Sequence, residues 1–180
     1  KNYSGENLML DQALITPTPK RDRGRRGLPI LPTQYDLPSD DGEPMESERH
    51  REQMCLLINS LQPWLNQHQG GYVSGNMFVY YSIKQIRHND FKGPDVFVVV
   101  GVPHTEHRSW VVWEEGKSLD VVIELLWEQT AKVDKEDKKQ LYQTQLTVPE
   151  YFWFDPFNPS DFTGFRLING VYQELQPDAQ

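Results

Sequence analysis

The sequence predicts an α/β fold in which a mixed central sheet is flanked by helices and preceded by an extended N-terminal arm. The runs 96–100 and 120–126 are rich in β-branched and aliphatic residues, which is typical of buried strands. Segments with helical spacing or helix-forming composition, 44–65 and 128–145, alternate with these strands. This alternation favours a sheet with helices packed against it, and 180 residues are enough for one such domain and an arm.

The N-terminal arm is predicted over residues 1–38 and the globular domain over residues 39–180. The first segment has many prolines and little periodicity, a composition typical of extended chain. It contains a basic cluster made of Lys20, Arg21, Arg23, Arg25 and Arg26. This cluster either contacts phosphate or is a solvated tail, and the tail is favoured because basic runs are common in tails.

A first helix is predicted from Pro44, where apolar residues begin to recur at the helical spacing. Its buried stripe would comprise Met54, Leu57, Ile58, Leu61, Trp64 and Leu65. Pro63 should kink or end its last turn. Extended backwards, the stripe reaches His50 and Glu46, which would then face the polar edge of the core, where a metal site would be. Alternatively, Glu46 favours the helix N-terminus electrostatically and His50 packs beneath it.

Shorter strands and turns are predicted around these elements. Strands are expected at 77–81, 109–113 and 151–156, and a closing hairpin at 165–172 turns at Asn169-Gly170. His104 and His107 have a spacing that metal sites use. With no cysteine nearby and no helix to present them, a surface loop is the favoured interpretation of these histidines.

Glu124 lies in the middle of the apolar strand 120–126. A carboxylate buried without a partner is strongly unfavourable, so the fold must supply a cation, a proton or a metal ion there. Asp95 occupies the start of the strand 96–100, directly after Pro94. Acids at corresponding ends of two strands indicate a divalent-metal site, because Mg²⁺ prefers carboxylate oxygens together with water.

The helix predicted at 128–145 carries its own candidates. Leu141 and Tyr142 should face the sheet, with Lys138 on the same stripe and Asp134 one turn earlier. Lys138 is therefore placed to reach inward. An ordinary surface pair between Asp134 and Lys138 is the alternative, and because Lys135 and Lys139 are neighbours the pattern alone does not single out Lys138.

Composition limits the classes of function. The net charge of −8 argues against non-specific duplex binding, although acids gathered at a metal site are compatible with a nuclease. The one cysteine, Cys55, excludes an intrachain disulfide framework. Because no apolar run approaches membrane-spanning length and no signal-peptide pattern is visible, we expect a cytoplasmic protein without membrane partners.

From about Tyr35 onward the chain resembles the Uma-two endonuclease family, which is abundant in cyanobacteria and belongs to the PD-(D/E)XK nuclease superfamily. The segments that carry the resemblance are 37–51 (LPSDDGEPMESERHR), 94–102 (PDVFVVVGV), 109–115 (SWVVWEE), 120–124 (DVVIE), 134–142 and 148–156 (VPEYFWFDP). Their order and spacing are specific, whereas no single segment is. The resemblance implies a restriction-endonuclease-like fold and a DNA phosphodiester substrate.

The resemblance also implies roles for individual residues. Asp95 and Glu124 would hold Mg²⁺ or Mn²⁺ together with the backbone carbonyl of Leu125. An acidic residue of the first helix, used by some members, would fall on Glu46. The lysine expected two positions after Glu124 is replaced by Leu126, so the family pattern assigns the catalytic lysine to Lys138.

Bulky Trp127 stands where family members often carry a small residue, next to the predicted site. The departures at Leu126 and Trp127 keep a second hypothesis open: a catalytically inactive nuclease-fold protein that binds DNA or a protein partner. A third is an oligomer, for example a homodimer, whose arm exchanges between subunits while a buried lysine or arginine neutralises Glu124.

Overall fold

The computed structural model describes residues 30–39, 47–88 and 93–176. Residues 32–180 form one compact unit, which is described below. The basic cluster of the predicted arm lies outside the described residues. Leu37, at the end of that arm, is buried with Phe78 and Tyr80. The boundary predicted after residue 38 stays a prediction.

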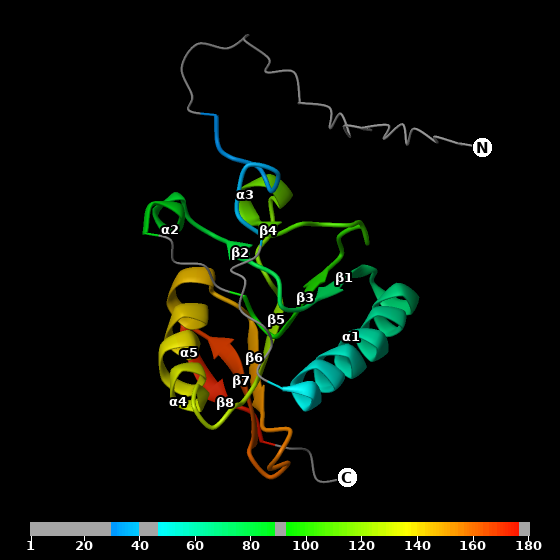
Figure 1. The fold of residues 1–180 in the computed structure, drawn as a ribbon, viewed down its shortest axis with the longest axis vertical. Helices are drawn as coiled ribbons and strands as arrows, with labels where there is room; N and C mark the ends of the chain where they lie inside the picture. The colour runs from blue at the N-terminus through cyan, green and yellow to red at the C-terminus, as the bar shows by residue number, and fades with distance from the viewer. Residues whose placement is uncertain (1–29, 40–46, 89–92, 177–180) are drawn as a thin grey trace, which may run out of the picture. The chain divides into compact units, whose positions relative to one another are not determined.

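A six-stranded mixed sheet forms the centre of the domain (Figure 1). In spatial order its strands are β1 (Gly71–Ser74), β3 (Val96–Val100), β5 (Val121–Leu125), β6 (Glu150–Phe154), β7 (Phe162–Ile168) and β8 (Val171–Glu174). The β5 and β6 strands are parallel, and all other neighbours in this sheet are antiparallel. This arrangement confirms the predicted mixed α/β fold, including the two apolar strands and the closing hairpin. The hairpin turn has positive φ at both Asn169 (51°) and Gly170 (80°), as a tight Asn-Gly turn requires.

A second, two-stranded parallel sheet pairs β2 (Val79–Tyr80) with β4 (Trp110–Val111). The strand predicted at 109–113 is therefore wrong in its second half, because the chain turns into the short helix α3 (Val112–Glu115). Gly116, with φ of 70°, ends that helix and donates its N–H to the Val112 carbonyl. Another short helix, α2 (Ile83–His88), follows β2.

The helix α1 (Glu48–His68) begins later than predicted, because Ser47 is extended and its side chain caps the helix by accepting the His50 N–H. Pro63 does not end the helix, which continues for more than a turn beyond it, and the alternative of a kink at Pro63 stays a prediction. The predicted burial of Trp64 is wrong, because this residue is 53% exposed. The Trp64 ring stacks on His68 at 4.3 Å between centroids, so the stripe facing the sheet is narrower than its apolar composition indicates.

The helix predicted at 128–145 is confirmed as a continuous helical stretch over residues 131–146. It comprises α4 (Ala131–Val133), η1 (Asp134–Lys138), α5 (Lys139–Leu141) and η2 (Tyr142–Leu146). The η1 and η2 turns are π-helical, which the composition did not predict. Thr147, with φ of 49°, ends the stretch. Such wide turns are frequent at functional sites.

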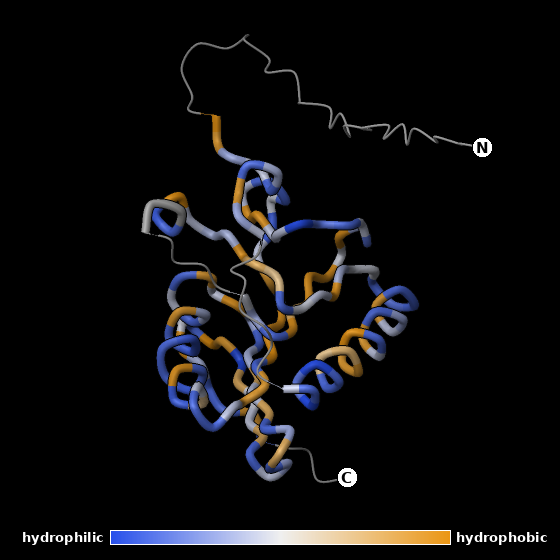
Figure 2. The backbone as a smooth tube through the Cα atoms, in the orientation of Figure 1, coloured by the Kyte–Doolittle hydropathy of each residue, from blue (hydrophilic) through white to orange (hydrophobic). Residues whose placement is uncertain are grey.

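The sheet is covered on both faces, with α1 on one side and the helical stretch 131–146 on the other (Figure 1). Alternation along β3 decides which side chain faces which layer: Val96 and Val98 pack with α1, whereas Phe97 and Val99 pack with the other layer. In Figure 2 hydrophobic residues lie along the central strands and recur in both α1 and the helical stretch 131–146. Among the described residues, no helix is both long and apolar enough to cross a bilayer.

Candidate active site

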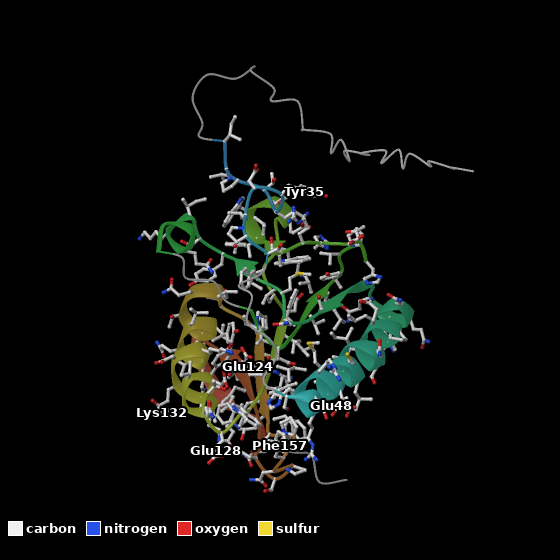
Figure 3. The ribbon with its side chains drawn as sticks, viewed as in Figure 1. Tyr35, Glu48, Glu124, Glu128, Lys132 and Phe157 are labelled. Carbon is white, nitrogen blue, oxygen red and sulfur yellow. The ribbon has the colours of Figure 1, made fainter. Side chains whose placement is uncertain are left out.

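Glu124 is fully buried in β5 and faces the helical stretch 131–146 (Figure 3). Tyr142 donates its hydroxyl to Glu124 Oε1 at 2.7 Å, and Lys138 Nζ lies 3.1 Å from Glu124 Oε2. The Asp95 backbone N–H also points at Oε2, at 3.3 Å. The cation that a buried carboxylate requires is thus supplied by Lys138.

Asp95 lies at the start of β3, beside the end of β5 that carries Glu124. Its Oδ2 accepts the Leu125 N–H at 2.7 Å, so the two acids meet on one side of the backbone of β5. Burial and the nearby charge of Glu124 raise the pKa of the Asp95 carboxyl well above its usual range, and the positive charge of Lys138 only partly offsets them. The pair is therefore an electrostatically strained site that favours additional positive charge.

Lys138 bridges two buried carboxylates. Its Nζ lies 2.8 Å from Asp134 Oδ1 in addition to its contact with Glu124. Burial alone would lower the pKa of Lys138, but Glu124, Asp134 and Asp95 together raise it, so the amine stays charged. The alternative of a surface pair is excluded, because the Asp134 side chain is only 3% exposed.

The neighbouring lysines point elsewhere, which resolves a choice that the helical pattern left open. Lys135 Nζ pairs with Asp161 at 2.7 Å, and Lys139 Nζ lies 3.6 Å from the centre of the Phe165 ring. Of these three lysines, Lys138 is the one beside Glu124.

Tyr142 and Tyr151 organise the polar side of this cluster. Burial, followed by the charge of Glu124, raises the pKa of Tyr142, so its hydroxyl remains a hydrogen-bond donor. Tyr151 donates its hydroxyl to the backbone carbonyl of Asp134 at 2.8 Å. The tyrosines therefore hold both acids that contact Lys138, one through its side chain and one through its backbone.

The backbone of Leu125 faces the same side as the Asp95 carboxylate. The next N–H, that of Leu126, donates to the Phe154 carbonyl of β6 at 2.8 Å. A trans peptide directs its C=O and its N–H to opposite sides, and the described residues contain no cis peptide. The Leu125 carbonyl therefore points away from β6, toward the side on which Asp95 lies.

His50, in the first turn of α1, is fully buried near the C-terminal end of β5. Its Nε2 lies 3.0 Å from the Leu126 carbonyl oxygen, and its ring contacts Trp127 and Phe157. Both proposed placements of His50 hold in part, because it packs beneath the helix start and also reaches the segment after Glu124. Glu46, the other residue predicted on this stripe, lies outside the described residues.

The two histidines of the loop after β3 belong to a different part of the domain. His107 Nε2 lies 3.2 Å from Glu115 Oε1, and the rings of both His104 and His107 contact Tyr72. Both histidines lie in a loop, as predicted, and His104 is exposed. The prediction of a surface position is wrong for His107, whose side chain is 5% exposed.

Residues 31–180 match the sequence model of the Uma2 (Uma-two) family, described as "Putative restriction endonuclease". The chain belongs to this family. No curated protein matches the sequence. A solved structure described as "a putative nuclease belonging to DUF820 from Anabaena variabilis" is similar, with a TM-score of 0.54 and 17% identity over 84% of this chain and 87% of that one.

Family and fold together support an endonuclease-like enzyme, and the resemblance expected from the sequence is confirmed. In this Uma2 protein the position of the expected strand lysine is taken by Leu126, whose side chain is 1% exposed in the core. Lys138 brings an amine to Glu124 from the helical stretch instead. Trp127 packs against His50 and Phe157.

The donor set of the Uma2 site fits Mg²⁺ or Mn²⁺. Mg²⁺ in phosphate chemistry is commonly bound by one or two carboxylates, with water and substrate oxygens as its other ligands. Asp95 and Glu124 provide those carboxylates, and a divalent cation would relieve the like-charge conflict between them. The part of the chain that the structure describes contains no group of three or more His, Cys, Asp and Glu side chains arranged for a metal ion.

Gly75 controls the position of Asp95. A Cβ at residue 75 would lie 2.0 Å from the Asp95 carbonyl oxygen and 3.0 Å from Met54 Sδ. We expect Gly75→Ala to lower the free energy of unfolding by about 1–3 kcal/mol, because the backbone at Asp95 must move. Urea unfolding measures the change. Gly93→Ala is the matched control, since the nearest atom to its added Cβ is 3.5 Å away; equal losses for both variants would contradict the prediction.

Proposed function

We propose that this Uma2 protein is a metal-dependent endonuclease that hydrolyses DNA phosphodiester bonds. The observation that carries the proposal is the convergence of Asp95, Glu124 and Lys138 from two adjacent strands and one helix. Two acids and an amine at one point combine the groups that metal-assisted phosphodiester hydrolysis uses.

Asp95, Glu124 and the Leu125 carbonyl would hold Mg²⁺ or Mn²⁺. Bound there, the ion would supply a water of lowered pKa and positive charge beside the scissile phosphate. Lys138 would stabilise the negative charge that develops on the phosphate oxygens, because its amine stays charged between two acids. Tyr142 would fix the rotamer of Glu124 through its hydroxyl.

Plasmid nicking tests the proposal. Supercoiled plasmid should be converted to open circles in Mg²⁺ or Mn²⁺ but not in excess EDTA, and both Asp95→Asn and Glu124→Gln should remove the activity. Glu150→Gln is the matched control, because Glu150 lies at the opposite end of the parallel pair, where it contacts Arg166 at 2.7 Å. Activity that survives either site variant, or that is independent of metal, would reject the proposal.

The same samples test the hypothesis of an inactive binding protein. The Glu124–Lys138 contact favours it in one respect, since the lysine already neutralises the buried acid. Gel retardation that weakens with salt, without nicking in either metal, would support DNA binding alone. Assembly as a homodimer stays a prediction, which light scattering of the purified protein checks.

A further inference from the structure

His50 connects the start of α1 to the backbone that follows Glu124. Its ring is fully buried, and Nε2 lies 3.0 Å from the carbonyl oxygen of Leu126. Leu126 is itself 1% exposed, so this carbonyl has little access to water. A buried carbonyl needs a donor, which the imidazole provides.

The hydrogen bonds determine the tautomer of this ring. A carbonyl oxygen can only accept, so Nε2 carries the proton. Nδ1 lies 2.8 Å from Ser47 Oγ, and the same oxygen accepts the His50 backbone N–H at 3.3 Å. The N-cap of α1 therefore also orients the imidazole.

Hydrogen bonds from three parts of the fold hold the backbone of Leu125 and Leu126. The Leu125 N–H is held by Asp95, the Leu126 N–H by Phe154 of β6, and the Leu126 carbonyl by His50. The bond to Asp95 belongs to the acidic pair, and the bond to Phe154 belongs to the sheet. His50 supplies the third from a different layer of the fold.

The ring of His50 is itself held by aromatic contacts. Its centroid lies 5.5 Å from that of Trp127 and 5.8 Å from that of Phe157. Arg49, the residue before it, covers the Phe157 ring with its guanidinium carbon 4.5 Å from the centroid. These contacts leave the imidazole little freedom to rotate away from the carbonyl.

We propose that His50 is a positioning residue of the active site. Its hydrogen bond to the Leu126 carbonyl fixes the backbone after Glu124, and this backbone orients both the Leu125 carbonyl and the Glu124 carboxylate. This inference rests on the proposed function, because it assigns His50 an effect on the metal that Asp95 and Glu124 would bind. His50 acts through the backbone and touches neither metal nor substrate.

The test replaces His50 with methionine and with glutamine. These side chains are similar in size, but only glutamine carries an N–H that can donate to the Leu126 carbonyl. Gln62→Met is the matched control. Gln62 is another polar residue of α1 that bonds to the sheet, donating to the Gly71 carbonyl and accepting the Val73 N–H, each at 3.0 Å.

Mn²⁺ alone is titrated into each protein and followed by electron paramagnetic resonance. We expect His50→Met to weaken Mn²⁺ binding roughly tenfold, in the range that loss of supporting hydrogen bonds produces in metal sites. His50→Gln should recover most of the affinity, and Gln62→Met should keep it. In nicking assays His50→Met should lower kcat with little change in KM for the plasmid.

Amide hydrogen exchange without metal supplies an independent readout. His50→Met should accelerate exchange at Leu126 and Trp127, whereas Gln62→Met should not. If His50→Met does not fold, His50→Asn replaces it, since its amide is one methylene shorter than that of glutamine and falls short of the carbonyl.

The outcomes separate this inference from the proposed function. If wild type binds Mn²⁺ and nicks plasmid, but the methionine variant matches it in affinity, kcat and exchange, the positioning role is overturned. The positioning role is also overturned if His50→Gln shows no higher Mn²⁺ affinity or kcat than His50→Met or His50→Asn. If wild type itself neither binds Mn²⁺ nor nicks DNA, the proposed function fails and the inference falls with it, whatever the variants do.

Discussion

Replacing Asp95 with asparagine is expected to abolish metal-dependent nicking and, at the same time, to raise the stability of the metal-free protein. Loss of a metal ligand should reduce the nicking rate at least about a hundredfold, because the bound ion stabilises the transition state by several kcal/mol. The amide keeps an oxygen that can accept the Leu125 N–H. The fold around β3 should therefore survive the change.

The gain in stability follows from the raised pKa of Asp95, which burial and the charge of Glu124 cause. As pH rises from about 4, an unfolded aspartate loses its proton before the folded one does. The unfolded state is then favoured, so in EDTA the stability that Asp95 contributes falls with rising pH until the folded carboxyl has also ionised. Asparagine removes this dependence.

Thermal unfolding from pH 4 to pH 8, in EDTA, measures the effect. The difference in Tm between Asp95→Asn and wild type should grow with pH and favour the variant. Mg²⁺ should then raise the Tm of wild type more than that of the variant. A variant that is less stable than wild type at every pH would contradict this account of the acidic pair.

Replacing Lys138 with methionine should produce the largest loss of stability of any change at this site. The substitution leaves Glu124 and Asp134 buried without their shared cation. Removing one partner of a buried ion pair typically costs 3–5 kcal/mol, and we expect about 3 kcal/mol because the Lys138 side chain is 25% exposed. Under conditions in which Lys138→Met remains folded, its nicking rate should be lower than that of wild type by a factor of about 10²–10³.

Lys135→Met provides the comparison for this change. Lys135 is also paired, 2.7 Å from Asp161, but both side chains are about one-third exposed, so its loss should cost at most about 1 kcal/mol. Urea unfolding at pH 7 measures both variants. Lys138→Arg, which keeps the charge, should recover part of the stability. Equal losses for the methionine variants would show that the buried acids do not depend on Lys138.

Local sequence patterns predicted the strands that carry Asp95 and Glu124 because an apolar run covered on both faces has a recognisable composition. They also placed Tyr142 and Asp134 on an inward-facing stripe, which their burial confirms. Patterns were less successful where a side chain's environment depends on distant elements. Trp64 matches the helical stripe, but its ring stacks on His68 in an exposed position, whereas the next residue, Leu65, is buried against the sheet.

The sequence by itself determined the mixed sheet, its acid-bearing strands and membership of the Uma2 family, since these depend on composition, spacing and the order of segments. Only the tertiary structure decided which lysine neutralises Glu124, because three candidates on one helix differ in the partners that Asp161 and Phe165 offer them. It also decided the role open to His50. The Leu126 carbonyl that binds its ring is 76 residues away in sequence. Because every residue has a backbone carbonyl, the amino-acid sequence does not indicate which one accepts this hydrogen bond.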